Sequence, residues 1–140
     1  MALTHLVDTS VLTRLANPLV REALESILRE GAVARAGISD LEIGFSARDV
    51  VEWDRLTNAI DAFPLVETTT AHVVRARQVQ RLLAERRQRG RKIPDLLIAA
   101  AAEELSLAVL HYDTDFDLIA EVTGQRTAWI VARGSIDLSA

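Results

Sequence analysis

The stretch from Ile93 to Asp117 constrains this chain most, because it joins an apolar helix to an apolar strand and carries acids at both ends. Asp95 comes directly after a proline, and the segment 96–105 is apolar on every side, which predicts a buried helix. The run 107–112 is typical of a strand. A buried helix that leads into an apolar strand is the unit of an α/β protein with a covered parallel sheet. The acids are either caps and turns or parts of a site.

The rest of the chain repeats this alternation of short strands and helices, which predicts an α/β domain with a helix-covered parallel sheet. We expect strands over residues 4–7, 32–37, 63–66, 107–112 and 127–131. We expect helices over 18–30, 39–48, 50–62, 70–89, 95–105 and 115–123. Asn17-Pro18 is a strong helix start, Ser39-Asp40-Leu41-Glu42 fits a capping box, and Pro64 favours an edge strand. At 140 residues the chain is predicted to form one domain, with a polar tail at 135–140.

Composition excludes several classes of protein. The chain has 49% hydrophobic and 26% charged residues, as ordinary globular proteins do, and no Cys, which excludes disulfides, thiolate zinc sites and cysteine nucleophiles. The N-terminus lacks the pattern of a signal peptide, and no apolar run reaches the length of a membrane span. We therefore expect a cytoplasmic protein without a membrane partner.

The basic residues are concentrated in one segment, although the net charge is −4. Half of the sixteen basic residues lie between positions 75 and 92, against the single acid Glu85. They are Arg75, Arg77, Arg81, Arg86, Arg87, Arg89, Arg91 and Lys92. This segment either forms a solvated helix face or attracts phosphate. The rest of the chain is acidic and is suited to bind cations.

Five acids stand where a cap or a site would place them: Asp8, Glu42, Asp95, Asp113 and Asp115. Taken singly, each has an ordinary structural explanation as a strand end, a capping box, an N-terminal acid or an Asx turn. Taken together, Asp8 and Asp113 follow two strands, and Glu42 and Asp95 begin helices that would point at the same sheet edge. Carboxylates that converge without a counter-charge repel one another, and an all-oxygen set favours Mg²⁺, with Mn²⁺ as a substitute.

Other motifs fail. Asp113-x-Asp115-x-Asp117 imitates a calcium loop, but Leu118 and Gly124 stand where Gly and Glu are required. The chain has no P-loop and no G-x-G-x-x-G pattern, and its histidines form no evident triad with a serine. His111 is expected to pack in a strand, and Trp53 and Phe45 to lie in the core or at a subunit interface.

The ordered set of acids resembles the PIN-domain ribonucleases, and in particular the VapC-type toxins of bacterial toxin–antitoxin pairs. The matching segments are the opening L-V-D-T-S, Glu42, the stretch P-D-L-L-I-A-A and the stretch Y-D-T-D-F-D-L-I-A, and together they span nearly the whole chain. The resemblance implies a single α/β/α nuclease domain over residues 1–134, with about five parallel strands. It also implies an RNA substrate, a VapB-type antitoxin that covers the site, and homodimerisation.

The resemblance also assigns roles. Asp8 and Asp95 would be the firmest metal ligands, Glu42 and Asp113 would complete an acidic quartet, and Asp115 would be an alternative or additional member. A metal-activated water would hydrolyse the phosphodiester bond, oriented by Glu42 or Asp113. Substrate contacts are expected from seven residues: Thr9, Ser10, Arg86, Arg87, Arg89, Arg91 and Lys92.

Two other functions have to be weighed. A non-catalytic binding module would use the acids as caps only, and alanine at Asp8 or Asp95 would then cost only about 1 kcal/mol. A phospho-acceptor domain of receiver type also gathers aspartates at a sheet edge, but it needs a lysine after a later strand. The single lysine, Lys92, precedes a helix instead, which argues against that class.

Overall fold

The computed structural model describes residues 2–88 and 92–137, and these form a five-stranded parallel sheet in the order β3-β2-β1-β4-β5. Each neighbouring pair of strands is parallel, so all carboxyl ends lie at one edge. The strands are β1 His5–Val7, β2 Val33–Ala36, β3 Leu65–Val66, β4 Ala108–His111 and β5 Thr127–Trp129. β3 is an edge strand, as Pro64 predicted.

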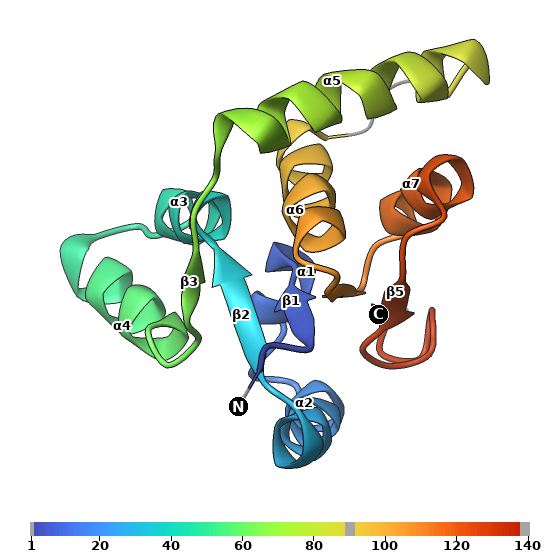
Figure 1. The fold of residues 1–140 in the computed structure, drawn as a ribbon. Helices are drawn as coiled ribbons and strands as arrows, with labels where there is room; N and C mark the ends of the chain where they lie inside the picture. The colour runs from blue at the N-terminus through green and yellow to red at the C-terminus, as the bar shows by residue number, and fades with distance from the viewer. Residues whose placement is uncertain (1, 89–91, 138–140) are drawn as a thin grey trace.

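Helices connect every pair of successive strands and lie on both sides of the sheet (Figure 1). They are α1 Thr9–Leu12, α2 Pro18–Glu30, α3 Gly37–Phe45, α4 Val50–Ile60, α5 Thr70–Glu85, α6 Ile93–Glu104 and α7 Asp115–Thr123. The α/β class and the parallel sheet predicted from the alternation of elements are confirmed. No helix of the described ranges is long and apolar enough to span a membrane.

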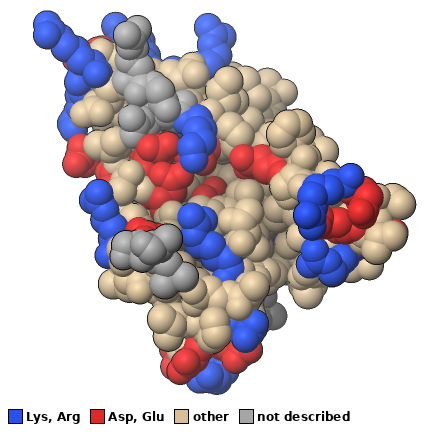
Figure 2. Space-filling model, turned by 180° about the vertical axis from the view of Figure 1, so that it is seen from behind, with Lys and Arg blue, Asp and Glu red and all other residues tan. Residues whose placement is uncertain are grey.

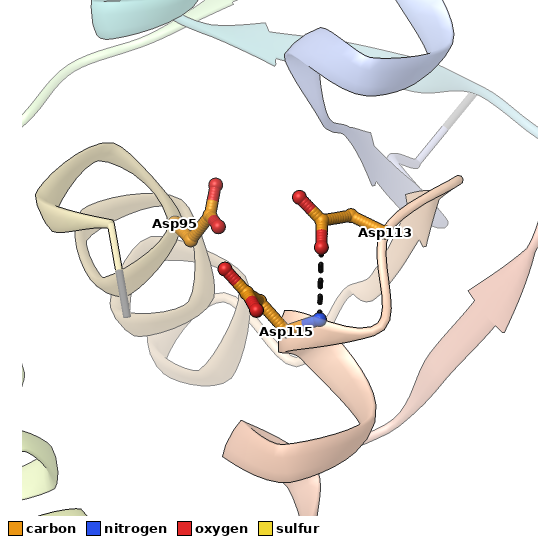
Figure 3. A group of neighbouring side chains, drawn as sticks. All are labelled: Asp95, Asp113 and Asp115. Carbon is orange, nitrogen blue, oxygen red and sulfur yellow. Dashed lines mark hydrogen bonds between the residues drawn. The ribbon is translucent and has the colours of Figure 1, made fainter. Parts of the chain in front are cut away.

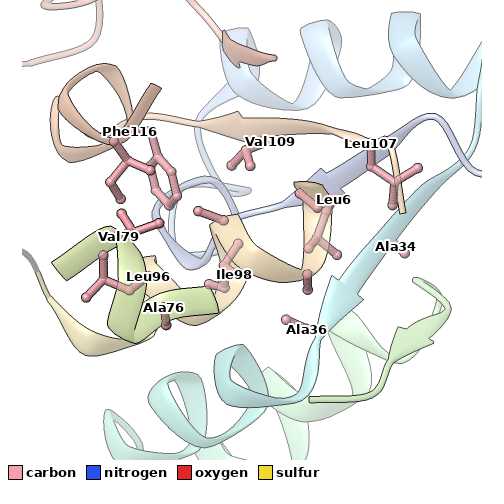
Figure 4. Packing of buried hydrophobic residues seen from close by; sticks show 14 of the residues in the cluster. Leu6, Ala34, Ala36, Ala76, Val79, Leu96, Ile98, Leu107, Val109 and Phe116 are labelled. Carbon is pink, nitrogen blue, oxygen red and sulfur yellow. The ribbon is translucent and has the colours of Figure 1, made fainter. Parts of the chain in front are cut away.

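Two hydrophobic clusters sandwich the sheet, because successive residues of a strand face opposite sides. Leu6 belongs to the cluster that α5, α6 and α7 cover, which also contains Ile98 of α6 and Phe116 of α7 (Figure 4). Val7, the next residue, belongs to the cluster on the α1, α2 and α4 side. Both sides of β1 are thus buried, which holds the residue after it, Asp8, firmly in place.

The predicted all-round apolar helix is α6. From Asp95 to Ala102 only Leu97 is more than slightly exposed, so the helix is enclosed by the sheet and by α5. Burial on all sides explains why the segment contains alanines: small side chains allow the helix close to its neighbours. α6 therefore delivers Asp95 from a rigid, buried element.

The capping box predicted at Ser39 is wrong. α3 begins two residues earlier, at Gly37, and its N-cap residue Ala36 offers no side-chain cap. Ser39 is fully buried inside the helix, and its hydroxyl contacts Thr9 instead of a backbone N–H. The helix follows β2 without a loop, so Glu42 comes in its second turn and not in its first.

Three further local predictions concern the cap of α2, the place of Phe45 and the C-terminal tail. Asn17 caps α2 as expected, its side chain accepting from the N–H of Leu19 at 2.9 Å. Phe45 is 92% exposed, so it is not a core residue, and its role at a subunit interface stays a prediction. In the predicted polar tail, Ile136 packs against the core and Asp137 accepts a hydrogen bond from the Tyr112 hydroxyl at 3.0 Å.

Candidate metal and phosphodiester site

A pocket of about 220 Å³ opens at the carboxyl edge of the sheet, above β1 and β4. Its lining combines four of the five predicted acids with hydroxyl and basic side chains. These residues are Asp8, Thr9, Ser10, Thr13, Arg14, Glu42, Lys92, Asp95, Tyr112 and Asp113. Figure 2 shows carboxylates gathered on one face of the molecule, with basic side chains close by. We call this the acidic pocket.

Asp8 is 2% exposed and caps α1. Its Oδ2 accepts hydrogen bonds from the Ser10 N–H at 3.0 Å and from the Ser10 hydroxyl at 2.6 Å. The same hydroxyl oxygen accepts from the N–H of Tyr112 at 2.9 Å, which ties the end of β1 to the end of β4. One carboxylate oxygen of Asp8 is therefore fixed, and the other, Oδ1, is buried without a partner.

Glu42 reaches the pocket from α3 and is held by Thr9. The Thr9 hydroxyl lies 2.7 Å from Oε1 of Glu42 and 2.8 Å from Oγ of Ser39. A hydroxyl has one proton and a carboxylate can only accept, so Thr9 donates to Glu42 and can accept from Ser39. The buried Ser39 thus supports the orientation of an acid on its own helix.

Asp95 of α6 faces Asp113, which lies between β4 and α7, and Asp115, the first residue of α7 (Figure 3). Each offers a carboxylate oxygen within 4.8 Å of the others. The N–H of Asp115 donates to Oδ1 of Asp113 at 2.9 Å, so the Asx turn expected as a purely structural alternative is present. This turn starts α7, and it also points the Asp113 carboxylate toward α6.

Burial and mutual repulsion shift the acidity of the group. Desolvation, with the charges of Asp8 and Asp113 and a hydrogen bond with Asp115, raises the pKa of Asp95 to about 8. Burial also raises the pKa of Asp8, against the hydrogen bonds from Ser10. Asp113 is less buried, and against that burial the Asp115 N–H and the Lys92 ammonium hold its pKa below the usual value. Two buried acids in this pocket are thus short of positive charge.

The donor set fits a hard divalent cation. Three buried side-chain polar atoms of the described residues have no hydrogen-bond partner, and two of them are Asp8 Oδ1 and Asp95 Oδ2. Buried polar atoms normally have partners, so two such carboxylate oxygens in one acidic pocket are suited to ligate a cation. The surrounding ligand atoms are oxygens, the type that Mg²⁺ and Mn²⁺ prefer.

The predicted basic contacts are only partly assembled here. Lys92 lines the pocket, and its Nζ lies 3.0 Å from Oδ2 of Asp113. Arg86 lies 3.8 Å from Glu121 of α7 instead, and neither it nor Arg87 lines the acidic pocket. Arg89 and Arg91 lie outside the described residues.

Sequence reasoning missed Arg14 and Tyr112, which also line the pocket. The Arg14 guanidinium lies over the Tyr112 ring, 5.1 Å from its centre. They are 98 positions apart in the sequence, and no local pattern signals their contact. His111 packs as predicted: it is fully buried between Phe116 and Trp129, with ring centres 5.0 Å apart in each pair.

Comparison with known proteins agrees with this geometry. The PIN domain family matches residues 5–122. The chain is 62% identical over 137 residues to Ribonuclease VapC51 of Mycobacterium tuberculosis, covering 98% of this chain and 100% of that protein. It is 42% identical to Ribonuclease VapC21 of the same species, covering 96% and 99%.

Solved structures show the same fold at low sequence identity. VapBC2 from Rickettsia felis, bound to a promoter DNA fragment, contains a chain that superposes with a TM-score of 0.75 at 13% identity, over 91% of this chain and 98% of that one. DNA-bound VapBC from Salmonella typhimurium gives 0.74 at 18% identity, over 92% and 99%. The chain therefore belongs to the PIN-domain family, with relatives that are named VapC ribonucleases.

Proposed function

We propose that the protein is a Mg²⁺-dependent endoribonuclease and acts as the toxin of a toxin–antitoxin pair. The observation that carries the proposal is the pair of buried, unpartnered carboxylate oxygens on Asp8 and Asp95, in a pocket with Glu42 and Asp113. The family and the 62% identical ribonuclease supply the reaction class.

Asp8, Asp95 and Asp113, with Asp115 as a further ligand, would hold the cation. A divalent cation at this place would supply a Lewis acid for a phosphate oxygen and lower the pKa of a bound water. Glu42, fixed by Thr9, or Asp113 would orient the attacking water and take its proton. Lys92 would contact phosphate oxygens, and the Thr9 and Ser10 hydroxyls, whose single protons go to Glu42 and Asp8, would hold these acids in place. The products would carry a 5′-phosphate and a 3′-hydroxyl.

The partners that we propose, an antitoxin and a second copy of the chain, rest on membership of the PIN-domain family. A VapB-type antitoxin would bind and silence the chain, and two copies would form a homodimer in the cytoplasm. Sizing of the purified chain by light scattering, alone and with its antitoxin, tests both: a monomer throughout would contradict the dimer, and no shift on mixing would contradict the antitoxin.

The deciding experiment is cleavage of a mixed RNA pool by antitoxin-free protein, in Mg²⁺ and in EDTA. Asp8→Ala and Asp95→Ala should abolish cleavage, whereas Asp54→Ala, an exposed acid of α4, should leave it unchanged. Cleavage that persists in both pocket variants, or none in the unmodified protein with Mg²⁺ or Mn²⁺, would contradict the proposal. If the unmodified protein cleaves no RNA, a binding module without catalysis becomes the better hypothesis.

A further inference from the structure

A second pocket, of about 380 Å³, adjoins the acidic pocket and shares Arg14, Tyr112 and Asp113 with it. Trp129 and Arg133 are among its other lining residues. We call it the flanking pocket. Its volume is within the range of sites that enclose small organic groups. The two pockets have a common wall. An RNA strand with a phosphate in the acidic pocket would therefore pass directly into the flanking pocket.

Flat groups form one wall of the flanking pocket. The rings of Tyr112 and Trp129 meet edge to face, with centres 5.3 Å apart and planes at 85°. Trp129 is partly buried, and its indole N–H donates to the Asp117 carboxylate at 3.2 Å, which fixes the ring. The Arg14 guanidinium lies over the Tyr112 ring, 5.1 Å from its centre. Aromatic rings and guanidinium planes are the surfaces on which unstacked nucleobases stack.

The charges of the flanking pocket are divided. Arg14 and Arg133 form no ion pair with any other residue of the described ranges, and Arg133 is exposed. Asp113 and Asp137 also line the pocket, and Asp137 is held by the Tyr112 hydroxyl. Carboxylates repel phosphate and accept hydrogen bonds from hydroxyls and amines, so a phosphate belongs at the arginines and a sugar or base near the acids.

We propose that the flanking pocket binds one unstacked nucleotide next to the phosphate that the acidic pocket holds. Its base lies against Trp129 and Arg14, and its phosphate contacts Arg133. The inference rests on the proposed nuclease function. A base can enter such a pocket only after it leaves a helical stack, so the cleaved segment must be unpaired at this position.

Trp129 provides a direct readout, because the chain has two tryptophans. Trp53 lies in α4, at the opposite edge of the sheet, so Trp53→Phe leaves Trp129 as the sole reporter. The titration uses a short single-stranded RNA of mixed sequence, in Ca²⁺, which takes the same oxygen ligands as Mg²⁺. Stacking of a base should quench the fluorescence of Trp129. An abasic strand of equal length should bind more weakly and leave Trp129 unquenched.

Arg133→Ala in the same background should weaken RNA binding about tenfold and reduce the salt slope by about 0.7, the value for one phosphate contact of a single strand. Arg133→Lys should restore most of the affinity. The matched control is Arg29→Ala, an exposed arginine of α2 near the amino edge of the sheet, which should leave binding and slope unchanged.

The outcomes separate this inference from the proposed function. Absence of quenching, equal quenching by the abasic strand, or equal effects of Arg133→Ala and Arg29→Ala would overturn the flanking pocket, even if RNA is cleaved in Mg²⁺. Quenching that depends on bases and on Arg133, without cleavage in Mg²⁺, would support the pocket and contradict the nuclease.

Discussion

The carboxyl end of β2 and the neighbouring ends of β1 and β4 handle buried charge in opposite ways. At β2, Arg35 is 8% exposed, and its guanidinium pairs with Asp40 of α3 through bonds of 2.7 and 3.1 Å. It also donates to the carbonyls of Ile60 and Phe63, which ties the end of α4 to the sheet. At β1 and β4, the buried acids Asp8 and Asp95 form no ion pair with an arginine of the described residues, although Arg14 lines the same pocket.

The difference indicates which charges serve the fold. The chain can place an arginine beside a buried acid, and it does so at Asp40. In the acidic pocket Lys92, whose side chain is 60% exposed, pairs with Asp113, and no basic group of the described residues forms an ion pair with Asp8 or Asp95. The buried Asp8 and Asp95 keep unpartnered oxygens. We infer that the burial of these two acids lowers stability and is retained for cation binding.

The largest expected effect comes from the same substitution made in each region. Asp95→Asn should lower Mg²⁺-dependent cleavage on the order of 10³-fold, because it removes an anionic ligand from the cation site. Asp40→Asn should leave the turnover of folded protein unchanged, because Asp40 pairs with Arg35 and lies outside the acidic pocket. Single-turnover cleavage rates measure both, and equal losses would remove the distinction between the regions.

Arg35→Met should destabilise the protein by about 3 kcal/mol, because it leaves the Asp40 carboxylate and two carbonyls without their donor. The free energy of unfolding in urea measures this loss. The matched control is Arg48→Met, which breaks an exposed pair with Glu52 and should change stability little. Similar results for the two variants would mean that the buried pair contributes no more than a surface one.

The metal-free protein should become less stable as the pH rises from about 4 to about 8. In this range the folded state keeps a proton on Asp95, whose pKa is about 8, while the unfolded state has lost it near its ordinary value. Stability therefore falls progressively with pH over this window, because only the unfolded state releases the proton. Thermal melts in EDTA test this. Asp95→Asn or added Mg²⁺ should flatten the dependence of stability on pH. If Asp95→Asn leaves this dependence unchanged, another group causes it.

Thr9→Val should have the smallest effect, lowering the cleavage rate about tenfold or less, because Glu42 loses one hydrogen bond but stays in place on α3. Thr9→Ser keeps the hydroxyl and should retain most of the activity. Single-turnover rates of the two variants provide the measurement. If Thr9→Ser is as slow as Thr9→Val, the hydroxyl is not what matters at this position.

Much of the fold was predictable, because it depends on short-range patterns. The apolar segment after Asp95 forms the buried helix α6, and the apolar run before Asp113 forms strand β4. Parallel strands bring their carboxyl ends to one edge, so acids placed after two strands were predictable as residues of the same edge. The failed capping box shows the limit of such patterns. Ser39 and Glu42 both contact Thr9, which is 30 and 33 residues away and which the local motif cannot reveal.

The sequence by itself determined the order of elements and the acids at their ends, because periodicity and composition act over a few residues. Only the tertiary structure decided the partners of these acids. The order β2-β1-β4 sets Ser10 beside Tyr112, 102 positions away, and Lys92 beside Asp113. It also brings Arg14, Trp129 and Arg133 around one pocket. These contacts depend on how the strands are arranged in the sheet, which no single segment of the chain specifies.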